Sequence, residues 1–530
     1  MGIDRREFLG TAIGAGLGAA IAAGGASSAF AARQGFRLEE ATVTGLQEAM
    51  RSGEMTSRQL VQAYLRRAAT VDKQVNSMIE LNPDALQIAD QMDRERKSGK
   101  VRGPLHGVPV VLKDNIDTAD KMKTTAGSLA LLNAPTPKKD AFIAARLREA
   151  GAVILGKTNL SEWANFRDND SISGWSGRGG QTRNPYILDR NPCGSSSGSG
   201  AAISANIAAA AIGTETDGSI VCPSSVCGIV GLKPTIGLVS RSGIIPIAHS
   251  QDTAGPMTRT VADAAAVLTA ICGFDEADEA MAGREEAEPI DYTKFLDTGA
   301  LKGARIGVAR NYFGRRKDVD DMLNVSMDAM KKAGAVLVDV TIDSIGKFGA
   351  AEFEVLLYEF KTDLEKYLAG RNADHKTLDD LIQFNKDNEK REMPYFGQSI
   401  FEAAAKKGPL TDEAYIEALE TSKRLTQAEG IDLVMDRDKL DAIIGPSNAP
   451  TWMIDTVNGD CGSGYISSSS LAAVAGYPNI TVPAAFSKEL PLGISFFGKA
   501  FTEAKLIGIA FAFEQATKAR RQPKLLPTFA

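Results

Sequence analysis

Residues 192–200 read Pro-Cys-Gly-Ser-Ser-Ser-Gly-Ser-Gly, and residues 213–220 read Gly-Thr-Glu-Thr-Asp-Gly-Ser-Ile. An alanine-rich stretch over 201–211 joins them. Small residues let backbone N–H groups approach a ligand closely, and a turn rich in free N–H groups can hold developing negative charge. A phosphate-binding loop would end in Gly-Lys-Ser/Thr, which is absent here, and a flexible linker would not contain the hydrophobic stretch. The tract therefore indicates a turn that stabilises an anion.

Short apolar runs typical of buried strands lie on both sides of this tract. One covers 108–112 and leads into Lys113. Another, 152–155, follows a helical pattern over 141–149, and strand-like runs return from residue 440. Helices that alternate with short apolar strands predict an α/β fold in which helices cover both faces of a β-sheet.

The stretch at about 346–426 is charged, amphipathic and poor in glycine, which predicts helices laid beside the core. Because strand-like runs lie before and after it, the sequence predicts a single domain over residues 32–530 with a helical insertion at about 346–426. Nearer the N-terminus, Thr44-x-x-Gln47 and Thr56-x-x-Gln59 both fit the capping-box pattern that begins a helix.

The first residues resemble an export signal. Arg5-Arg6 precedes an apolar run rich in glycine and alanine, and Ala29-Phe30-Ala31 offers a small-x-small cleavage site. We therefore expect a twin-arginine signal peptide at residues 1–31, the Tat export machinery as a partner, and a periplasmic or secreted enzyme. A retained membrane anchor is the alternative, although the run is short and glycine-rich for a bilayer span.

Composition argues against several other classes of protein. The net charge of −6 at pH 7 disfavours a nucleic-acid partner, because phosphate binding needs clustered positive charge. The three histidines, His106, His249 and His375, form no His-Glu-x-x-His or comparable arrangement. We therefore expect no metal and no cofactor.

The serine-rich tract raises the question of which base would activate a serine. Residues 194–198 have the Gly-x-Ser-x-Gly spacing of a Ser-His-Asp hydrolase, but no apolar strand precedes them as that motif requires. With so few histidines, lysine is the other established base for a serine nucleophile.

The five cysteines, Cys193, Cys222, Cys227, Cys272 and Cys461, are an odd and sparse set for a disulfide scaffold. Cys222 and Cys227 lack the second pair or histidine cluster that a zinc site requires. We expect buried free thiols, with a disulfide formed after export as the alternative.

These blocks together resemble the amidase signature family, whose members carry a glycine-serine motif followed 24 residues later by a second serine, the separation of Ser195 and Ser219 here. The strand leading into Lys113-Asp114-Asn115 is similar to that family's lysine motif. The likeness covers roughly residues 38–519, with further blocks at 159–163, 231–235, 252–256 and 476–483. It implies that family's fold, which has a large mixed β-sheet covered by helices on both faces.

The resemblance implies a role for each residue of a triad. Ser219 would be the nucleophile that forms an acyl-enzyme, Ser195 would relay a proton, and Lys113 would act as the base in its neutral form. A free lysine has a pKa near 10.4, so burial must lower that pKa for the base to work at neutral pH.

The backbone N–H groups of Thr216, Asp217, Gly218 and Ser219 would form the oxyanion hole. Asp217 stands where the family often has the first glycine of a pair, but backbone donors survive that change. The carboxyls of Glu215 and Asp217 are expected to accept hydrogen bonds from the backbone rather than to transfer protons.

Several neighbouring residues compete for these assignments. Lys157 also follows a strand, so spacing alone does not separate it from Lys113. Ser196, Ser197 and Ser199 lie beside Ser195, whose assignment rests on the alignment of the glycine-serine string. Trp452 and Tyr465 are candidate contacts for the substrate.

The expected reaction is hydrolysis of a carboxamide C–N bond. The motifs most resemble peptide amidases, which remove the C-terminal amide of peptides, and small aliphatic or aryl amides are the alternative substrates. A tRNA-dependent amidotransferase subunit shares the fold, but the expected export signal argues against it. The expected partner is thus a small-molecule or peptide amide.

Overall fold

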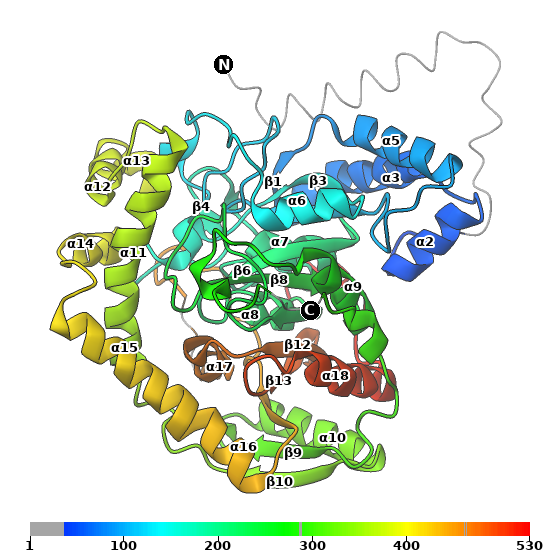
Figure 1. The fold of residues 1–530 in the computed structure, drawn as a ribbon, viewed down its shortest axis with the longest axis vertical. Helices are drawn as coiled ribbons and strands as arrows, with labels where there is room; N and C mark the ends of the chain where they lie inside the picture. Colours follow the sequence, from blue (N-terminus) through cyan, green and yellow to red (C-terminus); the bar gives the residue numbers. More distant parts are fainter. Residues whose placement is uncertain (1–35, 286–288, 461, 463, 530) are drawn as a thin grey trace.

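The computed structural model describes residues 36–285, 289–460, 462 and 464–529 (Figure 1). The signal peptide expected at residues 1–31 lies outside these residues. In the described part, eleven strands form one sheet in the order β1-β3-β2-β6-β8-β7-β12-β13-β11-β9-β10. The strands are β1 Met78–Leu81, β2 Pro109–Lys113, β3 Val153–Thr158, β6 Ala210–Glu215, β7 Val230–Lys233, β8 Thr253–Thr258, β9 Arg305–Ala309, β10 Val336–Val340, β11 Ala442–Pro446, β12 Asn479–Ser487 and β13 Leu490–Phe497.

The sheet is mixed, as the resemblance implied. Strands β3, β2 and β6 run parallel to one another, as do β11, β9 and β10. The strands between these two groups pair antiparallel. Strand β2 is buried along its whole length between β3 and β6, and it ends at Lys113. The catalytic candidate therefore lies at the end of an interior strand.

Helices cover both faces of the sheet. Helices α8 and α18 both pack on β12 and β13. Helices α6, α9, α18 and α10 contact one another in series, while α7 packs with α8. The helices of this core are α2 Val43–Arg51, α3 Ser57–Thr70, α4 Asp72–Val75, α5 Ala85–Lys97, α6 Phe142–Glu149, α7 Ser197–Ser204, α8 Val221–Val226, α9 Val261–Ile271, α10 Lys317–Lys332, α16 Asp432–Asp438, α17 Ser469–Ala475 and α18 Glu503–Thr517.

A run of helices separates two neighbouring strands of the sheet. Strand β9 comes before this run and β11 after it, yet the two strands pair in parallel. The helices are α11 Gly349–Arg371, α12 Leu378–Asp387, α13 Glu389–Glu392, α14 Ser399–Ala405 and α15 Glu413–Thr426, and they lie along one side of the sheet (Figure 1). Phe360 and Phe401 of this run pack with Trp163 in a hydrophobic cluster separate from the main core.

The two capping-box predictions had different outcomes. Thr56 caps α3 with the reciprocal hydrogen bonds to Gln59, so the second prediction is confirmed. The first is wrong, because Thr42 caps α2 by accepting from Gly45 N. Thr44 lies inside the first turn of that helix, where its side chain cannot perform the capping role.

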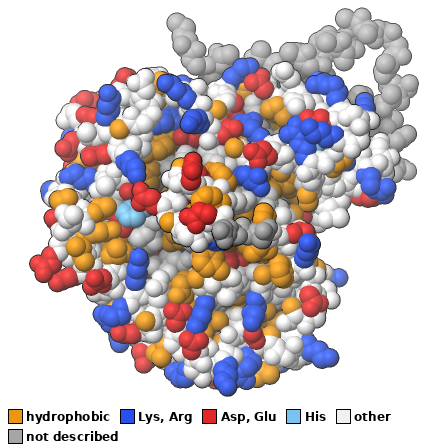
Figure 2. Space-filling view, viewed as in Figure 1, with side chains coloured by type: hydrophobic (Ala, Val, Ile, Leu, Met, Phe, Trp, Pro, Cys, Tyr) orange, Lys and Arg blue, Asp and Glu red, His pale blue; other side chains and the backbone are white. Residues whose placement is uncertain are grey.

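The surface of this fold is mixed in charge. Figure 2 shows acidic and basic side chains interspersed over one face rather than gathered in a single basic patch. Within the described residues, none of the helices combines the length and apolar character needed to cross a bilayer.

Candidate active site

Lys113 meets the serine-rich tract at the end of β2. Its side chain is fully buried. The Nζ atom donates to Ser195 Oγ at 2.7 Å and to Thr214 Oγ1 at 2.8 Å. Thr214 lies on β6, next to β2, so the pairing of these two strands brings the lysine to the tract. Sequence reasoning missed Thr214, because a threonine in a strand carries no signal that distinguishes it from a packing residue.

Burial changes the protonation of Lys113. Removal of the ammonium from water lowers its pKa to about 7, against the opposing influence of the carboxylates of Asp252 and Glu215. Desolvation disfavours the charged form of a lysine, and here it outweighs both acids. A large fraction of this lysine is therefore neutral near pH 7, which is the form that a base requires.

Ser195 is distinguished from its neighbours by its hydrogen bond to Lys113. The hydroxyl of Ser196 donates to Thr214 O at 3.0 Å, and that of Ser197 donates to Cys193 O at 2.6 Å. Ser199 Oγ lies 2.7 Å from Thr158 Oγ1. Each competing serine is thus engaged elsewhere, and the geometry supports the register expected from the sequence.

Close packing explains why the tract is rich in glycine. A Cβ atom on Gly198 would lie 2.4 Å from the carbonyl oxygen of Asn159, closer than real atoms approach. Helix α7 can therefore lie directly against the segment after β3. The N–H of Ser196 donates to Ser219 O at 3.2 Å, so this packing also brings the two serine segments into contact.

Ser219 lies at a turn that leads from β6 into α8. The Glu215 Oε2 atom accepts from the N–H groups of Ile220 and Val221 at 2.7 and 3.0 Å, which confirms the expectation that this carboxyl binds backbone. Gly218 adopts a φ of +76°, which glycine adopts without strain. Among the described residues, the N–H groups over 216–219 meet no acceptor in the chain.

Asp217 accepts a hydrogen bond from a side chain rather than from the backbone. Its Oδ1 atom accepts from Ser469 Oγ at 2.7 Å, which ties the turn to the start of α17. Burial raises the pKa of this carboxyl. The side chain thus holds the turn in place while the backbone N–H groups stay available.

A cavity of about 520 Å³ opens over this turn. It is lined by Ser219 and Asp217, and by Trp452 and Tyr465 from the chain after β11, as the sequence suggested. Asp460 accepts from Trp452 Nε1 at 3.0 Å and fixes the indole. The other lining residues include Phe166, Leu356, Gly218, Ser467 and Ser470. A pocket of this size matches those that hold small ligands.

Lys157, the competing lysine, has other partners. It is also fully buried, but its Nζ donates to the Ile116 carbonyl and to Thr124 Oγ1. Burial lowers its pKa as well. Its hydrogen bonds hold a loop rather than a serine, so the geometry favours Lys113 as the base.

The histidines make contacts away from Lys113 and the two serines. His249 Nδ1 lies 2.8 Å from Asp363 Oδ2, and its Nε2 lies 3.4 Å from Glu359 Oε1. The atoms of His249, Glu359 and Asp363 that could bind a metal ion lie within 4.8 Å of one another. In this structure the histidine pairs with the two carboxylates. His106 bonds the Met92 carbonyl at 3.0 Å. The His375 ring packs on Phe384.

The expectation for the cysteines was wrong at two positions. Cys193 and Cys222 form a disulfide, whereas Cys227 and Cys272 are free and Cys461 lies outside the described residues. The two bonded residues are 29 apart in sequence, and the packing of α7 and α8 brings their Cα atoms to 6.0 Å. A count of cysteines carries no information about that packing.

Comparisons with known proteins identify the family of this chain. Residues 59–507 match the Amidase family. The X-ray structure of native peptide amidase from Stenotrophomonas maltophilia is 51% identical, with a TM-score of 0.88 over 93% of this chain and 100% of that chain. A probable amidase of Arabidopsis thaliana is 41% identical over 502 residues, 93% of each chain. One subunit of the glutamyl-tRNA(Gln) amidotransferase of Thermoanaerobacter pseudethanolicus is 34% identical over 507 residues, 92% of this chain and 98% of that protein.

The family match covers most of the chain, and the fold is shared with solved peptide amidases over nearly all of its length. The matched part contains the lysine strand, the serine tract and the turn at Ser219. The chain therefore belongs to the amidase signature family and is an enzyme that hydrolyses amide C–N bonds.

Proposed function

We propose that the chain hydrolyses amides through Ser219, Ser195 and Lys113, with Ser219 as the nucleophile. The observation that carries this proposal is the 2.7 Å hydrogen bond from Lys113 Nζ to Ser195 Oγ. It involves a lysine whose pKa burial lowers to about 7. A neutral amine in contact with a hydroxyl can accept a proton, and a second hydroxyl can pass its own proton along the same path.

The reaction then proceeds in two halves. Ser219 Oγ attacks the carbonyl carbon while its proton passes to Ser195 Oγ, whose own proton passes to Lys113 Nζ. The N–H groups of Thr216, Asp217, Gly218 and Ser219 stabilise the oxyanion. The C–N bond breaks as the nitrogen takes a proton back along the same path and leaves as ammonia or an amine. Water then attacks the acyl-enzyme, the acid leaves, and Ser219 recovers its proton.

The proposed substrate is a peptide with a C-terminal amide. Support comes from the 51% identity to a peptide amidase and from the cavity over Ser219. Trp452 and Tyr465, whose ring centroids lie 5.9 Å apart, give that cavity an aromatic wall. Aromatic side chains bury large apolar areas, which suits the side chains of a peptide. Small aliphatic or aryl amides would make less use of this wall.

The experiment that tests this proposal is ammonia release from a panel of peptide amides, aliphatic amides and aryl amides. The proposal predicts release from peptide amides by wild type, and none above background by Ser219→Ala. A matched control is Ser224→Ala, which removes a buried hydroxyl that has no hydrogen-bond partner in the described chain. Activity on small amides alone would contradict the peptide substrate. Undiminished activity of Ser219→Ala would contradict the nucleophile.

We further propose that residues 1–31 direct export through the Tat machinery, so that the enzyme acts in the periplasm or outside the cell. The support is the Arg5-Arg6 pair followed by a glycine-rich apolar run. In a bacterium with this pathway, amide hydrolysis should appear in the exported fraction and disappear from it when Arg5 and Arg6 are both changed to lysine. Equal cytoplasmic activity of both forms would contradict export.

A further inference from the structure

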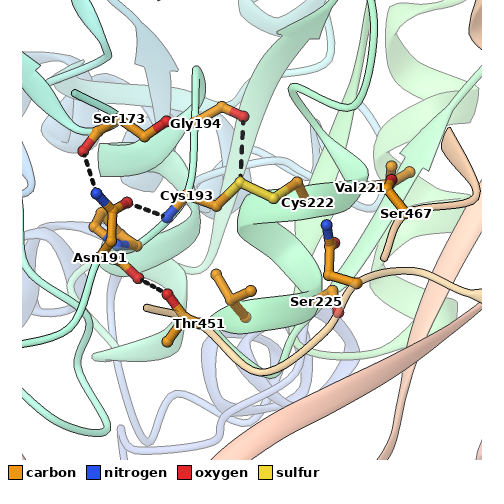
Figure 3. The surroundings of a disulfide bond; sticks show 12 residues. Ser173, Asn191, Cys193, Gly194, Val221, Cys222, Ser225, Thr451 and Ser467 are labelled. Carbon is orange, nitrogen blue, oxygen red and sulfur yellow. Dashed lines mark hydrogen bonds between the residues drawn. A yellow bond between two sulfur atoms is a disulfide. The ribbon is translucent and has the colours of Figure 1, made fainter. Parts of the chain in front are cut away.

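The disulfide lies in the wall of the active-site cavity. Cys193 and Cys222 both line the cavity that Ser219 lines. Cys193 comes two residues before Ser195, and Cys222 comes three residues after Ser219. The chain between the two cysteines thus contains both serines. Figure 3 shows the bond joining the loop segment at Cys193 to helix α8 at Cys222.

Cys193 has a backbone conformation that needs support. Its φ is +56°, in the left-handed region that residues with a Cβ rarely adopt. Such conformations persist when the surrounding structure fixes them. Three contacts do so here. Cys193 N donates to Asn191 Oδ1 at 2.8 Å, and the side chain is bonded to Cys222 (Figure 3). In addition, Ser197 Oγ donates to Cys193 O at 2.6 Å.

The opposite end of the disulfide is tied to the nucleophile turn. Cys222 N donates to Gly218 O at 2.8 Å, directly before Ser219. Between the Ser195 segment and the nucleophile turn itself, Ser196 N donates to Ser219 O at 3.2 Å, and the Ser196 hydroxyl is bonded to the backbone of Thr214, further back on β6. The covalent bond therefore joins, through a few residues on each side, two segments whose relative position sets the distance from Ser195 to Ser219.

We infer that this disulfide is a positioning element of the proposed triad, and that turnover depends on its oxidation. When the bond is reduced, Cys193 loses one of its three supports, and only hydrogen bonds still join the Ser195 segment to the nucleophile turn. Proton transfer between the hydroxyls requires hydrogen-bond distance, so kcat falls while the cavity still binds substrate. This inference rests on the proposed function.

The redox step is a thiol–disulfide exchange. Dithiothreitol supplies two electrons and two protons to the S–S bond, leaves Cys193 and Cys222 as thiols, and closes into its own cyclic disulfide. Glutathione disulfide reverses the change by taking two electrons and two protons, and two glutathione molecules result. The cavity gives small thiols a route to the bond, since both cysteines line it.

The test compares oxidised and reduced forms of the folded full-length enzyme on one peptide amide. Folded wild type is treated with dithiothreitol and alkylated in a quenched aliquot, and mass spectrometry must find two more alkylated cysteines than before. We expect kcat to fall at least about tenfold, KM to stay within about twofold, and circular dichroism to be unchanged, because an effect on alignment alone changes kcat rather than binding. Treatment with glutathione disulfide should restore kcat.

Variants separate the disulfide from the free thiols. The double variant Cys193→Ser with Cys222→Ser should show the low kcat of the reduced enzyme and no further response to dithiothreitol. The matched control Cys227→Ser removes a buried free thiol, and it should keep wild-type kcat and the full response to reduction. A reduced enzyme with two additional thiols and undiminished kcat would overturn the inference while leaving the amidase proposal intact. If the oxidised enzyme hydrolysed none of the amides, both the proposed function and this inference would be wrong.

Discussion

The Nζ atom of Lys113 lies 2.7 Å from the Oγ atom of Ser195, in a position closed to solvent. Burial lowers the pKa of Lys113 to about 7, and the Ser195 hydroxyl that it contacts is buried as well. A hydrogen bond thus joins a residue from an interior strand to one from a glycine-rich tract 82 residues further along the chain, and it is the first link of the proposed proton path.

The pH dependence of catalysis should follow this lysine. In the proposed mechanism the neutral amine is the active form, so kcat/KM should rise with pH through an ionisation near pH 7 and level off above it. Lys113→Ala should lower kcat/KM by about 10²- to 10⁴-fold and abolish this ionisation. Initial rates between pH 5 and 10 measure both effects. A variant that keeps the wild-type profile would exclude Lys113 as the base.

Stability should also change with pH because of Lys113. Its pKa is about 7 when folded and 10.5 for the model group, so between these values the unfolded chain binds a proton that the folded protein does not. The free energy of unfolding therefore rises with pH across this window, by about 1.4 kcal/mol per pH unit from this group. Urea unfolding at pH 7, 8 and 9 should show this gain in wild type relative to Lys113→Met. Parallel curves for the two proteins would contradict it.

Ser195 and Ser196 offer a matched pair of adjacent hydroxyls. Ser195→Ala removes the group bonded to Lys113, and kcat should fall by about 10²- to 10⁴-fold. Ser196→Ala removes a hydroxyl bonded to the Thr214 carbonyl and should cost about 1 kcal/mol of unfolding free energy while kcat stays near wild type. Steady-state kinetics and urea unfolding of both variants make the comparison. Equal losses of kcat would show that the register is wrong.

The disulfide should contribute to stability as well as to alignment. Closing a loop of 29 residues is expected to add about 3 to 4 kcal/mol to the free energy of unfolding by restricting the unfolded chain. Unfolding in urea with and without dithiothreitol measures that difference. The double variant of Cys193 and Cys222 should have the same free energy of unfolding as reduced wild type, and dithiothreitol should not change it. Coincident curves for oxidised and reduced wild type would refute this estimate.

Much of the fold could be predicted from the sequence because its strands are short apolar runs with clear ends. The expected strand over 108–112 is β2, and the helix expected over 141–149 is α6. The start of a helix was harder to predict where two threonines lie close together in the sequence. Thr42 rather than Thr44 caps α2, although Thr44 is the one followed three residues later by a glutamine. The hydrogen bond from Val43 N to Asp263 Oδ1, which joins distant parts of the chain, helps to fix the start of the helix.

The candidate site was predictable to the extent that it followed a family motif. Spacing alone could not separate Lys113 from Lys157, because both lie near the ends of buried strands. What separates them is that β2 pairs with β6, and this pairing joins parts of the chain 101 residues apart at Lys113 and Thr214. The disulfide depends in the same way on how two helices pack. Such long-range arrangements leave no local pattern of residues.

The helices from Gly349 to Thr426 have their own hydrophobic cluster, and they contribute Leu356 to the cavity wall. Lys113, Ser195 and Ser219 all come from the other part of the chain. Natural variation could therefore reshape the wall that meets the substrate by altering the length or composition of this helical run, without disturbing the strands that carry the chemistry. In such an architecture, substrate preference can change during evolution through the helical run, while the residues proposed to carry out the reaction stay the same.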